Sequence, residues 1–360
     1  MFPTLARNAL TRNPDFKRSK PGKTLADMPL GFIDVGARGG AHDMMEPVAE
    51  STAVLGFEPD EVECSRLLAI PEVTAPWERI ELEPIALADK TGKATLHLLS
   101  AATNHSLLPP NAAFTKRYNM VKWQVIGKEK LDVVPLDSIL FGKRKKESFW
   151  GEFMKLDTQG TEYEVLMGAK RTLKERTVAV VCEVSFCELY KGQKLFSDVE
   201  AFMREQGFSF YGFTTIHGRS RKLLDKRQFI TAERAIYSDA IFFKDPLPGG
   251  PKPVKLSARQ THVLFTVALL LNFYDFAWEL ATETWLKRAD KVEKEKISRL
   301  ITSVAQHRPE DTLKALDNLL KQANAKPELA NLCAGSFVDK RRRLCDYDDV
   351  LNTSPLPKTF

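Results

Sequence analysis

The 360-residue sequence has few of the features that mark secreted or membrane proteins. Its five cysteines include no Cys-x-x-Cys pair, and such sparse, irregular usage is typical of a reducing compartment. No apolar segment follows the basic N-terminus, so we predict no secretory signal. The most hydrophobic stretch, Val263–Leu271, is much shorter than the roughly 20 residues of a membrane span. These absences predict a soluble, cytoplasmic protein without a membrane span.

A strong charge of one sign is also missing. Lys and Arg number 53 and Asp and Glu 47, which gives a net charge of +6. This excess is compatible with anionic partners but does not require them. The short basic runs Lys143–Lys146 and Lys340–Arg343 fit solvated loops or helix ends, with phosphate contacts as the alternative.

Hydrophobic periodicity and Pro/Gly content divide the chain into four parts. Residues 1–29 carry prolines and charges without clear periodicity, which predicts a flexible arm or a strap. Residues 30–245 alternate short apolar runs with helical patterns. Residues 246–257 are a linker by composition, and residues 258–360 predict an α-helical module with a flexible tail.

The alternation in residues 30–245 predicts an α/β fold with a mostly parallel, doubly wound sheet and helices on both faces. Ligand sites in such sheets lie at the carboxyl ends of the strands. Residues 101–151 are less regular and are predicted to face a substrate. The predicted strands cover residues 32–35, 52–57, 79–87, 95–99, 153–156, 178–184, 208–213 and 240–243, and the predicted helices cover residues 61–68, 161–174, 196–206, 258–288, 292–306 and 310–323.

The first informative motif, Asp34-x-Gly36-x-x-x-Gly40, ends the first predicted strand. A glycine at position 36 permits a tight turn and lets the backbone approach a ligand closely. The Gly-x-Gly-x-x-Gly spacing of nicotinamide-binding proteins is absent. Because Asp34 precedes the glycines, the loop suits a cationic ligand better than a pyrophosphate.

The second motif is Gly56-Phe57-Glu58-Pro59, at the end of the second predicted strand. An acidic residue about 22 positions beyond the first glycine can accept both hydroxyl hydrogens of an adenosyl ribose. A lone glutamate at a strand end is more often a surface charge or a helix cap. Together with Asp34 and the glycines, Glu58 is interpreted as a ligand-binding residue.

The third motif runs from Lys155 through Asp157 and Gly160 into a predicted helix. Thr161 as a helix cap and Glu162 facing the helix dipole would explain the helix start. They leave Lys155 and Asp157 unexplained.

The order of these motifs resembles the FkbM family of methyltransferases over roughly residues 30–244. The resemblance implies the class I methyltransferase (Rossmann-like) fold, a seven-stranded sheet with an antiparallel last strand. It also implies S-adenosylmethionine as cofactor and O-methylation, often of sugar hydroxyls in glycans, glycolipids or natural products. It does not cover residues 250–360. The matching pieces are Phe32–Gly40, Gly56–Pro59, Ile85–Gly92, Lys155–Ala169, Glu183, Leu189–Gln193, Phe196 and Asp239–Phe242.

Carried over by position, the resemblance implies that Asp157 lies near the transferred methyl group. Arg38 departs from the family, which often has a small or amide residue there. The residues expected to bind the cofactor are Asp34, Gly36, Ala37, Gly40, Glu58, Pro59 and Ala86.

Transfer to a hydroxyl needs a base, and the candidates are Asp157, Glu183 and His105. Each has an equally strong structural alternative: His105 as a hydrogen-bonded loop residue, or Glu183 paired with Lys155. Asp157, Glu183 and Asp89 have oxygen atoms that suit a divalent ion, but no dedicated metal motif is present, so no metal is predicted. The residues expected to contact the substrate, a small molecule or glycan, are Asn104, Lys155, Gln159 and Tyr190, with core packing as the alternative for Tyr190.

Two other functions remain open at this point. A nucleic-acid methyltransferase is disfavoured because Pro109-Pro110-Asn111 lacks an aromatic residue to stack on a flipped base. The chain could instead bind cofactor without catalysis while its C-terminal helices mediate homo-oligomer assembly. The apolar residues within Val263–Leu271 fit either a dimer seam or a packed inner face.

Overall fold

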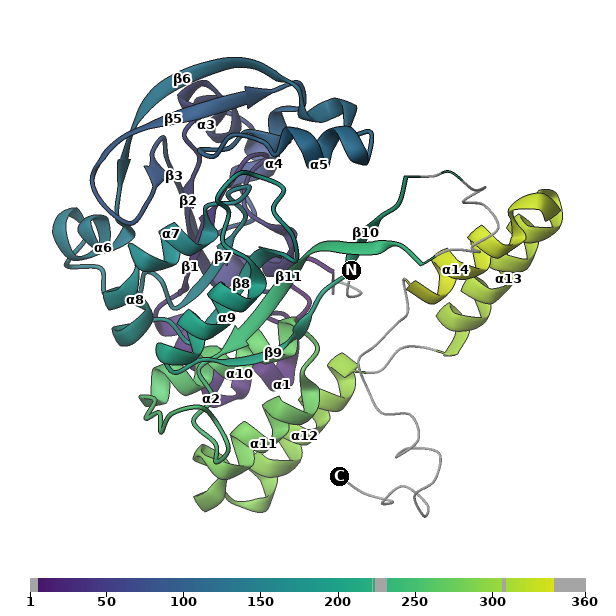
Figure 1. Ribbon diagram of the computed structural model, residues 1–360. Coiled ribbons are helices and arrows are strands. Elements are labelled where there is room, and N and C mark those ends of the chain that lie inside the picture. The colour runs from purple at the N-terminus through teal and green to yellow at the C-terminus, as the bar shows by residue number, and fades with distance from the viewer. Residues whose placement is uncertain (1–5, 222, 224–231, 306–308, 340–360) are drawn as a thin grey trace.

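The structure of the chain, a computed structural model, describes residues 6–221, 223, 232–305 and 309–339. Its centre is an eight-stranded sheet in the order β10-β11-β8-β7-β1-β2-β3, with β9 paired to β11 (Figure 1). Strands β3, β2, β1, β7 and β8 are parallel, and β11 runs antiparallel to β8. The predicted mostly parallel sheet with an antiparallel end is therefore confirmed. The strands are β1 (Leu30–Val35), β2 (Thr52–Phe57), β3 (Arg79–Glu83), β7 (Phe153–Leu156), β8 (Ala179–Ser185), β9 (Ser209–Phe213), β10 (His217–Arg219) and β11 (Arg234–Phe243).

The inner strands are mostly apolar because both faces of the sheet are covered. Every residue of β1, β2 and β7 is buried. Val35 at the end of β1 is level with Phe57 of β2 and Leu156 of β7. The three strands therefore end together, and the residues that follow them meet at one edge of the sheet.

A second, three-stranded sheet lies beside this edge, with the order β4-β6-β5. It consists of β4 (Ala86–Leu87), β5 (Gly92–Leu99) and β6 (Val125–Val134). The sequence predicts part of β5 but not β6, in which Val133 alone is fully buried. Without an apolar alternation, a strand leaves no period-2 signal.

Successive residues of a strand point to opposite faces of the sheet, which gives two cores. On one face, Ile33 and Met154 pack with the helices between the strands. The predicted helix 161–174 is broken at Gly168, where a Cβ would lie 2.1 Å from the Ala88 carbonyl oxygen. The helices between the strands are α3 (Glu61–Leu68), α4 (Pro71–Thr74), α5 (Ala112–Arg117), α6 (Leu136–Ser138), α7 (Glu162–Met167), α8 (Lys170–Glu175) and α9 (Phe196–Glu205), with shorter helical turns at Asp43–Ser51, Ala102–Asn104, Val121–Trp123 and Ile139–Lys143.

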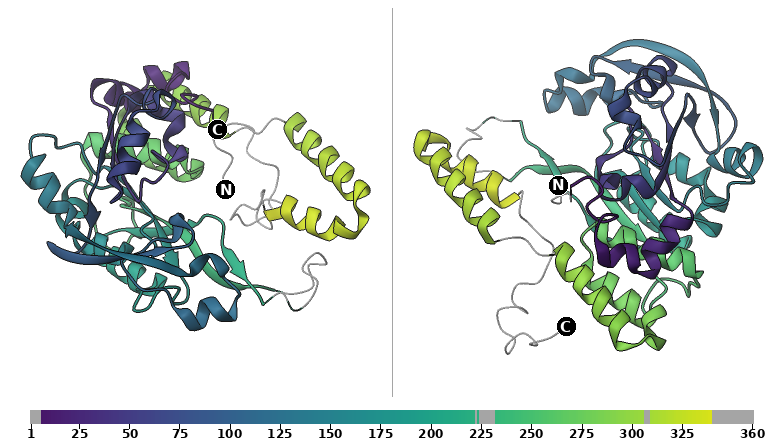
Figure 2. Two further views of the ribbon diagram at one scale, coloured as in Figure 1. Left: turned by 90° about the horizontal axis from the view of Figure 1, so that it is seen from above. Right: turned by 180° about the vertical axis from the view of Figure 1, so that it is seen from behind.

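The other face is covered by helices from both ends of the described chain (Figure 2). Phe16 and Leu25, each 1% exposed, pack into the same core as Phe32 of β1. Residues 14–27 are thus a packed part of the fold rather than a flexible arm. The covering helices are α1 (Pro14–Arg18), α2 (Lys20–Asp27), α10 (Ala258–Leu270), α11 (Tyr274–Glu283) and α12 (Lys291–Ala305), with a helical turn at Trp285–Arg288.

Helix α10 is buried along its length, from Thr261 to Leu269. Because this apolar face is already covered within one chain, it is the packed inner face rather than a dimer seam. None of the described helices combines the length and apolar character that a membrane crossing requires.

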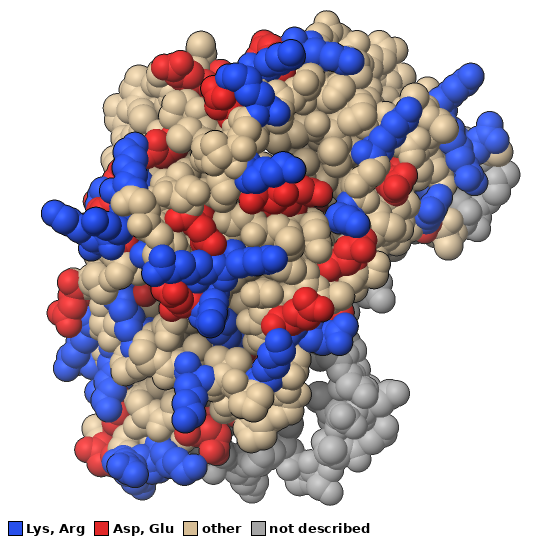
Figure 3. Space-filling model, turned by 60° about the vertical axis from the view of Figure 1, so that its left-hand side comes forward, with Lys and Arg blue, Asp and Glu red and all other residues tan. Residues whose placement is uncertain are grey.

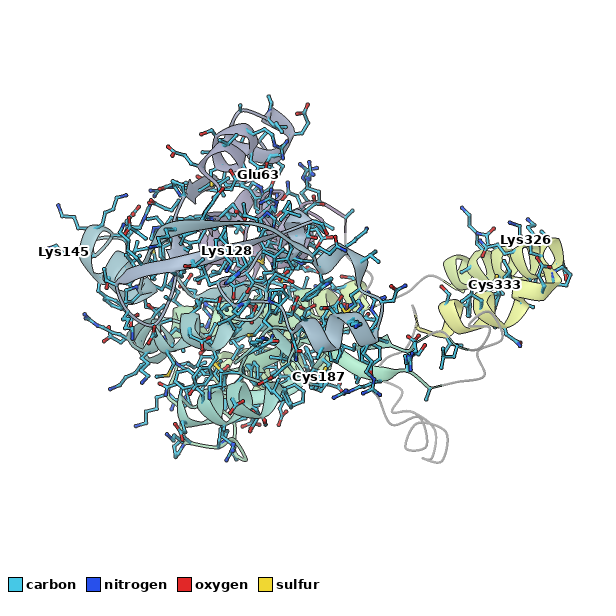
Figure 4. The ribbon with its side chains drawn as sticks, turned by 45° about the horizontal axis from the view of Figure 1, so that its top comes forward. Glu63, Lys128, Lys145, Cys187, Lys326 and Cys333 are labelled. Atoms are coloured by element: carbon cyan, nitrogen blue, oxygen red, sulfur yellow. The ribbon has the colours of Figure 1, made fainter. Side chains whose placement is uncertain are left out.

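The last helices described, α13 (Pro309–Ala325) and α14 (Ala330–Asp339), are joined by a turn at Pro327–Leu329 and form a hairpin that stands apart from the body (Figure 2). Lys326 and Cys333 mark this hairpin, well separated from Lys128 on β6 (Figure 4). No residue described for the hairpin belongs to the buried clusters of the sheet.

The two basic runs have different outcomes. In Lys143–Lys146, Arg144 is buried and pairs with Glu81 and Glu83, so part of this run belongs to an ion-pair network. The run Lys340–Arg343 lies outside the described residues. Acidic and basic side chains are interspersed on the face seen in Figure 3.

Candidate active site

The glycine loop after β1 is shaped by its neighbour β7. Gly36 has φ +86°, and a Cβ there would lie 2.0 Å from the carbonyl oxygen of Asp157. Glycine is therefore required at position 36 by close backbone packing as well as by the turn. The backbone N–H groups of Gly36 and Ala37 both donate to the Phe57 carbonyl, which ties the loop to the end of β2.

Asp34 is 1% exposed and faces the interior. Its Oδ2 accepts a hydrogen bond from the His42 backbone N–H at 2.9 Å, and its Oδ1 lies 3.6 Å from Lys155 Nζ. The cation beside Asp34 is thus a lysine of the chain. Asp34 orients Lys155 and the glycine loop, and it does not itself line a cavity.

A cavity of about 710 Å³, here called the glycine-loop cavity, opens between the ends of β1 and β2 and the second sheet. Such a volume suits a small-molecule ligand. Its lining includes eight of the residues predicted for the site, which are Gly36, Glu58, Pro59, Ala86, His105, Lys155, Asp157 and Gln159. Ala37 and Gly40 are not among its lining residues.

The glycine-loop cavity carries an excess of negative charge. Glu58 is 6% exposed; its Oε1 accepts from the Asp60 N–H at 3.1 Å and lies 3.7 Å from Arg38. Burial raises the pKa of Glu58, although the Asp60 N–H and Arg38 oppose the shift. Cationic ligands are favoured in such surroundings. The lining carboxylates are Glu58, Asp60, Glu61, Glu129 and Asp157, and the lining Lys and Arg residues are Arg38 and Lys155.

Apolar side chains form the remaining walls, several of them from the second sheet. This sheet was only partly predicted, so sequence reasoning missed its contribution. The apolar wall includes Phe57, Ile85, Leu96, Leu98, Leu107 and Leu131.

A second cavity of about 940 Å³ lies next to the first and is here called the aromatic cavity, after Tyr118, Trp123 and Tyr237 in its wall. Thr103, Asp157 and Gln159 line both cavities. The shared residues place the two cavities in contact.

Gln159 connects the groups at this junction. It adopts φ +59°, a conformation uncommon for residues other than glycine. Its Nε2 donates to Asp157 Oδ1 at 2.7 Å and to Glu183 Oε2 at 3.3 Å. One amide thus holds both predicted acidic residues.

Asp157 and Glu183 have opposite protonation tendencies. Burial opposes ionisation of Asp157, but Lys155 and Gln159 hold its pKa below the usual value. Burial and the negative charge of Asp157, Glu162 and Asp239 raise the pKa of Glu183 well above its usual value. A carboxylate with a raised pKa is a stronger base than an ordinary one.

Lys155 is paired with Asp34 and Asp157, not with Glu183. Burial opposes its charge, yet the neighbouring carboxylates raise the pKa of Lys155. It stays cationic and lines the glycine-loop cavity but not the aromatic cavity.

His105 lines the glycine-loop cavity, and Asn104 lines the aromatic cavity. The Nδ1 atom of His105 accepts a hydrogen bond from the Leu99 N–H at 3.1 Å. In the neutral ring the proton is then on Nε2, which makes that atom a donor. Burial and Arg38 lower the pKa of His105. The histidine is better arranged to donate a hydrogen bond than to accept a proton.

Tyr190 is 1% exposed and lines neither cavity. Its hydroxyl lies 3.0 Å from the Asn104 carbonyl oxygen and 3.1 Å from Gln159 Oε1. Its ring packs on Trp123, with centroids 4.9 Å apart. Tyr190 was expected to contact the substrate, but it lies outside both cavities. Its hydrogen bond to Gln159 instead helps to position the Gln159 amide.

Glu162 serves the loop that holds Asp157. Its carboxylate accepts hydrogen bonds from the backbone N–H groups of Thr158 and Gly160, and Thr161 makes no side-chain cap. Burial is the main cause that raises the pKa of Glu162 to about 7.

Oxygen atoms of Asp157, Glu162 and Glu183 lie within 4.8 Å of one another, a spacing that a metal ion could bridge. Asp89, the third acid considered from the sequence, is exposed and not part of this group. The oxygens of Glu162 already accept backbone hydrogen bonds, and Lys155 provides a positive charge beside Asp157.

Several residues of the aromatic cavity were not predicted. Asp239 is paired in register with Glu183 across β8 and β11, and because it lies within an antiparallel strand the strand-end rule does not identify it. Trp123 and Tyr118 lie in the irregular region 101–151, where no periodicity marks them. Pro109, Pro110 and Asn111 line neither cavity.

Comparison with known proteins gives a family match for the central part of the chain. Residues 34–210 match the family described as Methyltransferase FkbM domain. No curated protein matches the chain. The matched segment contains the glycine loop, Glu58, Asp157 and Glu183.

Two of the solved structures that are similar to the chain are methyltransferases by their descriptions. One is a methyltransferase FkbM from Methylobacillus flagellatus KT, 15% identical, with a TM-score of 0.35, covering 60% of this chain and 43% of that one. The other is a magnesium protoporphyrin IX methyltransferase from Synechocystis PCC 6803 with bound SAM, 11% identical, with a TM-score of 0.30, covering 62% of this chain and 76% of that one. The chain thus spans less than half the length of the first of these proteins.

Proposed function

We propose that this chain is an S-adenosylmethionine-dependent methyltransferase that methylates a hydroxyl group of a polyhydroxylated acceptor such as a sugar. The match of residues 34–210 to the FkbM domain supports the methyltransferase activity. The observation that carries the proposal is the contact between two cavities that share Thr103, Asp157 and Gln159. One cavity suits a cationic nucleoside, and the other is polar and lined by carboxylates. Two reactants bound in adjoining cavities meet at the shared residues.

The glycine-loop cavity fits the cofactor in size, charge and polarity. Its carboxylates favour a sulfonium cation, and its apolar wall, with Phe57 and Ile85, suits an adenine ring. Glu58 at the end of β2 is placed to accept hydrogen bonds from ribose hydroxyls. Asp34 does not line this cavity, and it acts indirectly by fixing the positions of Lys155 and the glycine loop.

S-adenosylmethionine supplies an activated methyl group, so the chain's own task is to align and deprotonate the acceptor hydroxyl. Glu183, in the aromatic cavity with a raised pKa, is the proposed general base. Asp157 stays ionised at the junction and accepts a hydrogen bond from Gln159, which also donates to Glu183. Tyr190 fixes the Gln159 amide from behind.

The proposal is tested first by cofactor binding. Isothermal titration of the full chain with S-adenosylmethionine and S-adenosylhomocysteine should show binding of both. Glu58→Ala should weaken binding roughly 10–100-fold, the loss expected for a hydrogen bond to a charged group. Glu72→Ala, at an exposed position on α4, is the matched control and should bind normally. No affinity of the unaltered chain for either nucleoside would refute the proposal.

The reaction is tested by methyl uptake into a panel of sugars and glycosides, with the product's new methyl group located by NMR. We expect an O-methyl ether. Asp157→Asn should reduce kcat at least about 100-fold with cofactor affinity retained. Normal turnover of this variant would remove Asp157 from the mechanism, and a methyl group on nitrogen would rule out the hydroxyl acceptor.

A further inference from the structure

The aromatic cavity has opposite charges at its two ends. Asp157 directly follows β7, and Glu183 of β8 is paired in register with Asp239 of β11; all three are partly buried. Arg219 and Arg221 belong to β10 and the residues just after it, and both are exposed. The negative groups therefore lie deep in the cavity and the positive groups at its mouth.

The cations at the mouth, Lys122, Arg219 and Arg221, make no ion pair with any residue that the structure describes. By contrast, Arg38, Arg144 and Arg259 of the body all have carboxylate partners. These three cations, which have no ion-pair partner within the described part of the chain, surround one opening and produce a local positive field that favours an anion.

The deep end of the cavity repels an anion. Burial, together with the neighbouring carboxylates, raises the pKa of Glu183 well above its usual value. A negatively charged ligand group is therefore excluded from the deep end and directed to the mouth. The same carboxylates accept hydrogen bonds from ligand hydroxyls, and the aromatic wall of Tyr118, Trp123 and Tyr237 suits the apolar face of a sugar ring.

From this polarity we infer that the acceptor is a phosphorylated polyhydroxylated molecule, with its phosphate between Arg219, Arg221 and Lys122 and its reacting hydroxyl at Glu183. The planar fork of arginine matches phosphate oxygens in a bidentate geometry, which favours phosphate. At about 940 Å³ the cavity is large enough for more than a single sugar ring. The inference rests on the proposed function, since it names the acceptor class of that reaction.

The phosphate site is tested by titrating the full chain, saturated with S-adenosylhomocysteine, with inorganic pyrophosphate. We expect binding that weakens at least about 10-fold in Arg219→Gln/Arg221→Gln. The matched control is Lys128→Gln/Lys130→Gln, which removes the same charge from exposed positions on β6 and should bind pyrophosphate normally. Absence of binding by the unaltered chain, or equal binding by the arginine variant, overturns the inference.

The acceptor class is tested by methyl transfer to matched pairs of neutral sugars and their phosphates. For any sugar that is methylated, kcat/KM should be at least about 10-fold higher for the phosphate, and Arg219→Gln/Arg221→Gln should abolish this preference. Equal use of the neutral sugars, or methylation of a short single-stranded RNA alone, overturns the inference. Titration with S-adenosylmethionine distinguishes failure of this inference from failure of the proposed function. If only the inference is wrong, the unaltered chain and the arginine variant both still bind S-adenosylmethionine normally.

Discussion

Two acidic residues near the junction of the two cavities, Glu183 and Asp157, have pKa values shifted in opposite directions. Glu183 is surrounded by other carboxylates, whereas Asp157 faces Lys155. We expect kcat to rise with pH as Glu183 ionises through its raised pKa. Glu183→Gln should lower kcat about 10²–10⁴-fold and remove this rise, as measured by a pH–rate profile. A profile unchanged in shape would assign the base to another group.

The same raised pKa affects stability. Folding favours protonated Glu183, so the native state binds more protons than the unfolded state between the ordinary glutamate pKa of 4.5 and the raised pKa of the folded state. Stability therefore falls as pH rises through this window. Glu183→Gln should raise Tm at pH 8 by about 2–4 °C, the shift expected for ~1 kcal/mol in a domain of 150–250 residues, and leave Tm at pH 4.5 nearly unchanged. Thermal unfolding at both pH values measures the difference. A lower Tm at pH 8 would contradict it.

Two glycines of the same loop provide a matched comparison. Gly36 and Gly39 both have positive φ, +86° and +94°, but a Cβ would collide with the Asp157 carbonyl only at Gly36. Gly36→Ala should reduce the free energy of unfolding by about 2–5 kcal/mol, the sum of backbone strain and overpacking. Gly39→Ala should lose only about 1–2 kcal/mol. Urea denaturation measures the free energy of unfolding of both variants. Equal losses would show that the contact between a Cβ at position 36 and the Asp157 carbonyl does not affect stability.

Among structural elements, α10 is joined to the sheet by its buried apolar face and also by a partly buried ion pair between Arg259 and Glu152. Arg259 donates to both oxygens of Glu152, at 2.6 and 2.9 Å, and to the carbonyls of Met28 and Pro29. Glu152 also accepts from the Gly31 N–H. The guanidinium thus joins α10 to the residues where β1 and β7 begin.

Arg259→Ala should reduce the free energy of unfolding by about 3–5 kcal/mol, because it leaves Glu152 buried without its partner. Arg299→Ala, which removes an exposed pair with Asp15, should lose less than about 1 kcal/mol. Chemical denaturation measures both. Adding Glu152→Gln to Arg259→Ala should recover part of the loss, and no recovery would show that the stranded charge is not its cause.

Elements also differ in how far the sequence determines them. β1, β2 and β8 are mostly apolar runs and were predicted from local sequence alone. β6 is mostly exposed, and the break at Gly168 depends on the Ala88 carbonyl from a distant segment, so local periodicity shows neither. Tertiary packing decided these features.

The residues of the candidate site also differ in whether the local sequence predicts them or tertiary packing determines them. Asp157 and Glu183 were among the candidate bases named from the sequence, and both line the aromatic cavity. Asp34 was expected to meet the ligand but faces Lys155, since sequence does not reveal which partner an interior carboxylate has. Trp123 reaches the cavity from a segment without periodicity, and no sequence pattern marks it.

In the whole molecule, α10–α12 and α13–α14 have different relations to the sheet. Ile297 and Leu300 of α12 belong to the same core as β1, whereas no described residue of α13–α14 does. A chain ending at residue 305 should bind S-adenosylmethionine and unfold thermally like the full chain. A chain ending at residue 257 should fail to fold, because α10 is removed from the sheet. Circular dichroism and titration measure both. Loss of folding on removing α13–α14 alone would contradict this division.

The contacts between the two ends of the body also set the order in which the protein can form during its synthesis. Thr24 on α2 hydrogen-bonds to His262 on α10, 238 positions later. At about 5–20 residues per second, a ribosome takes roughly 10–50 seconds to make the intervening chain. Until α10 has been made, it cannot pack against Phe16, Leu25 and this face of the sheet. We therefore expect the nascent polypeptide to bind chaperones that shield apolar surface.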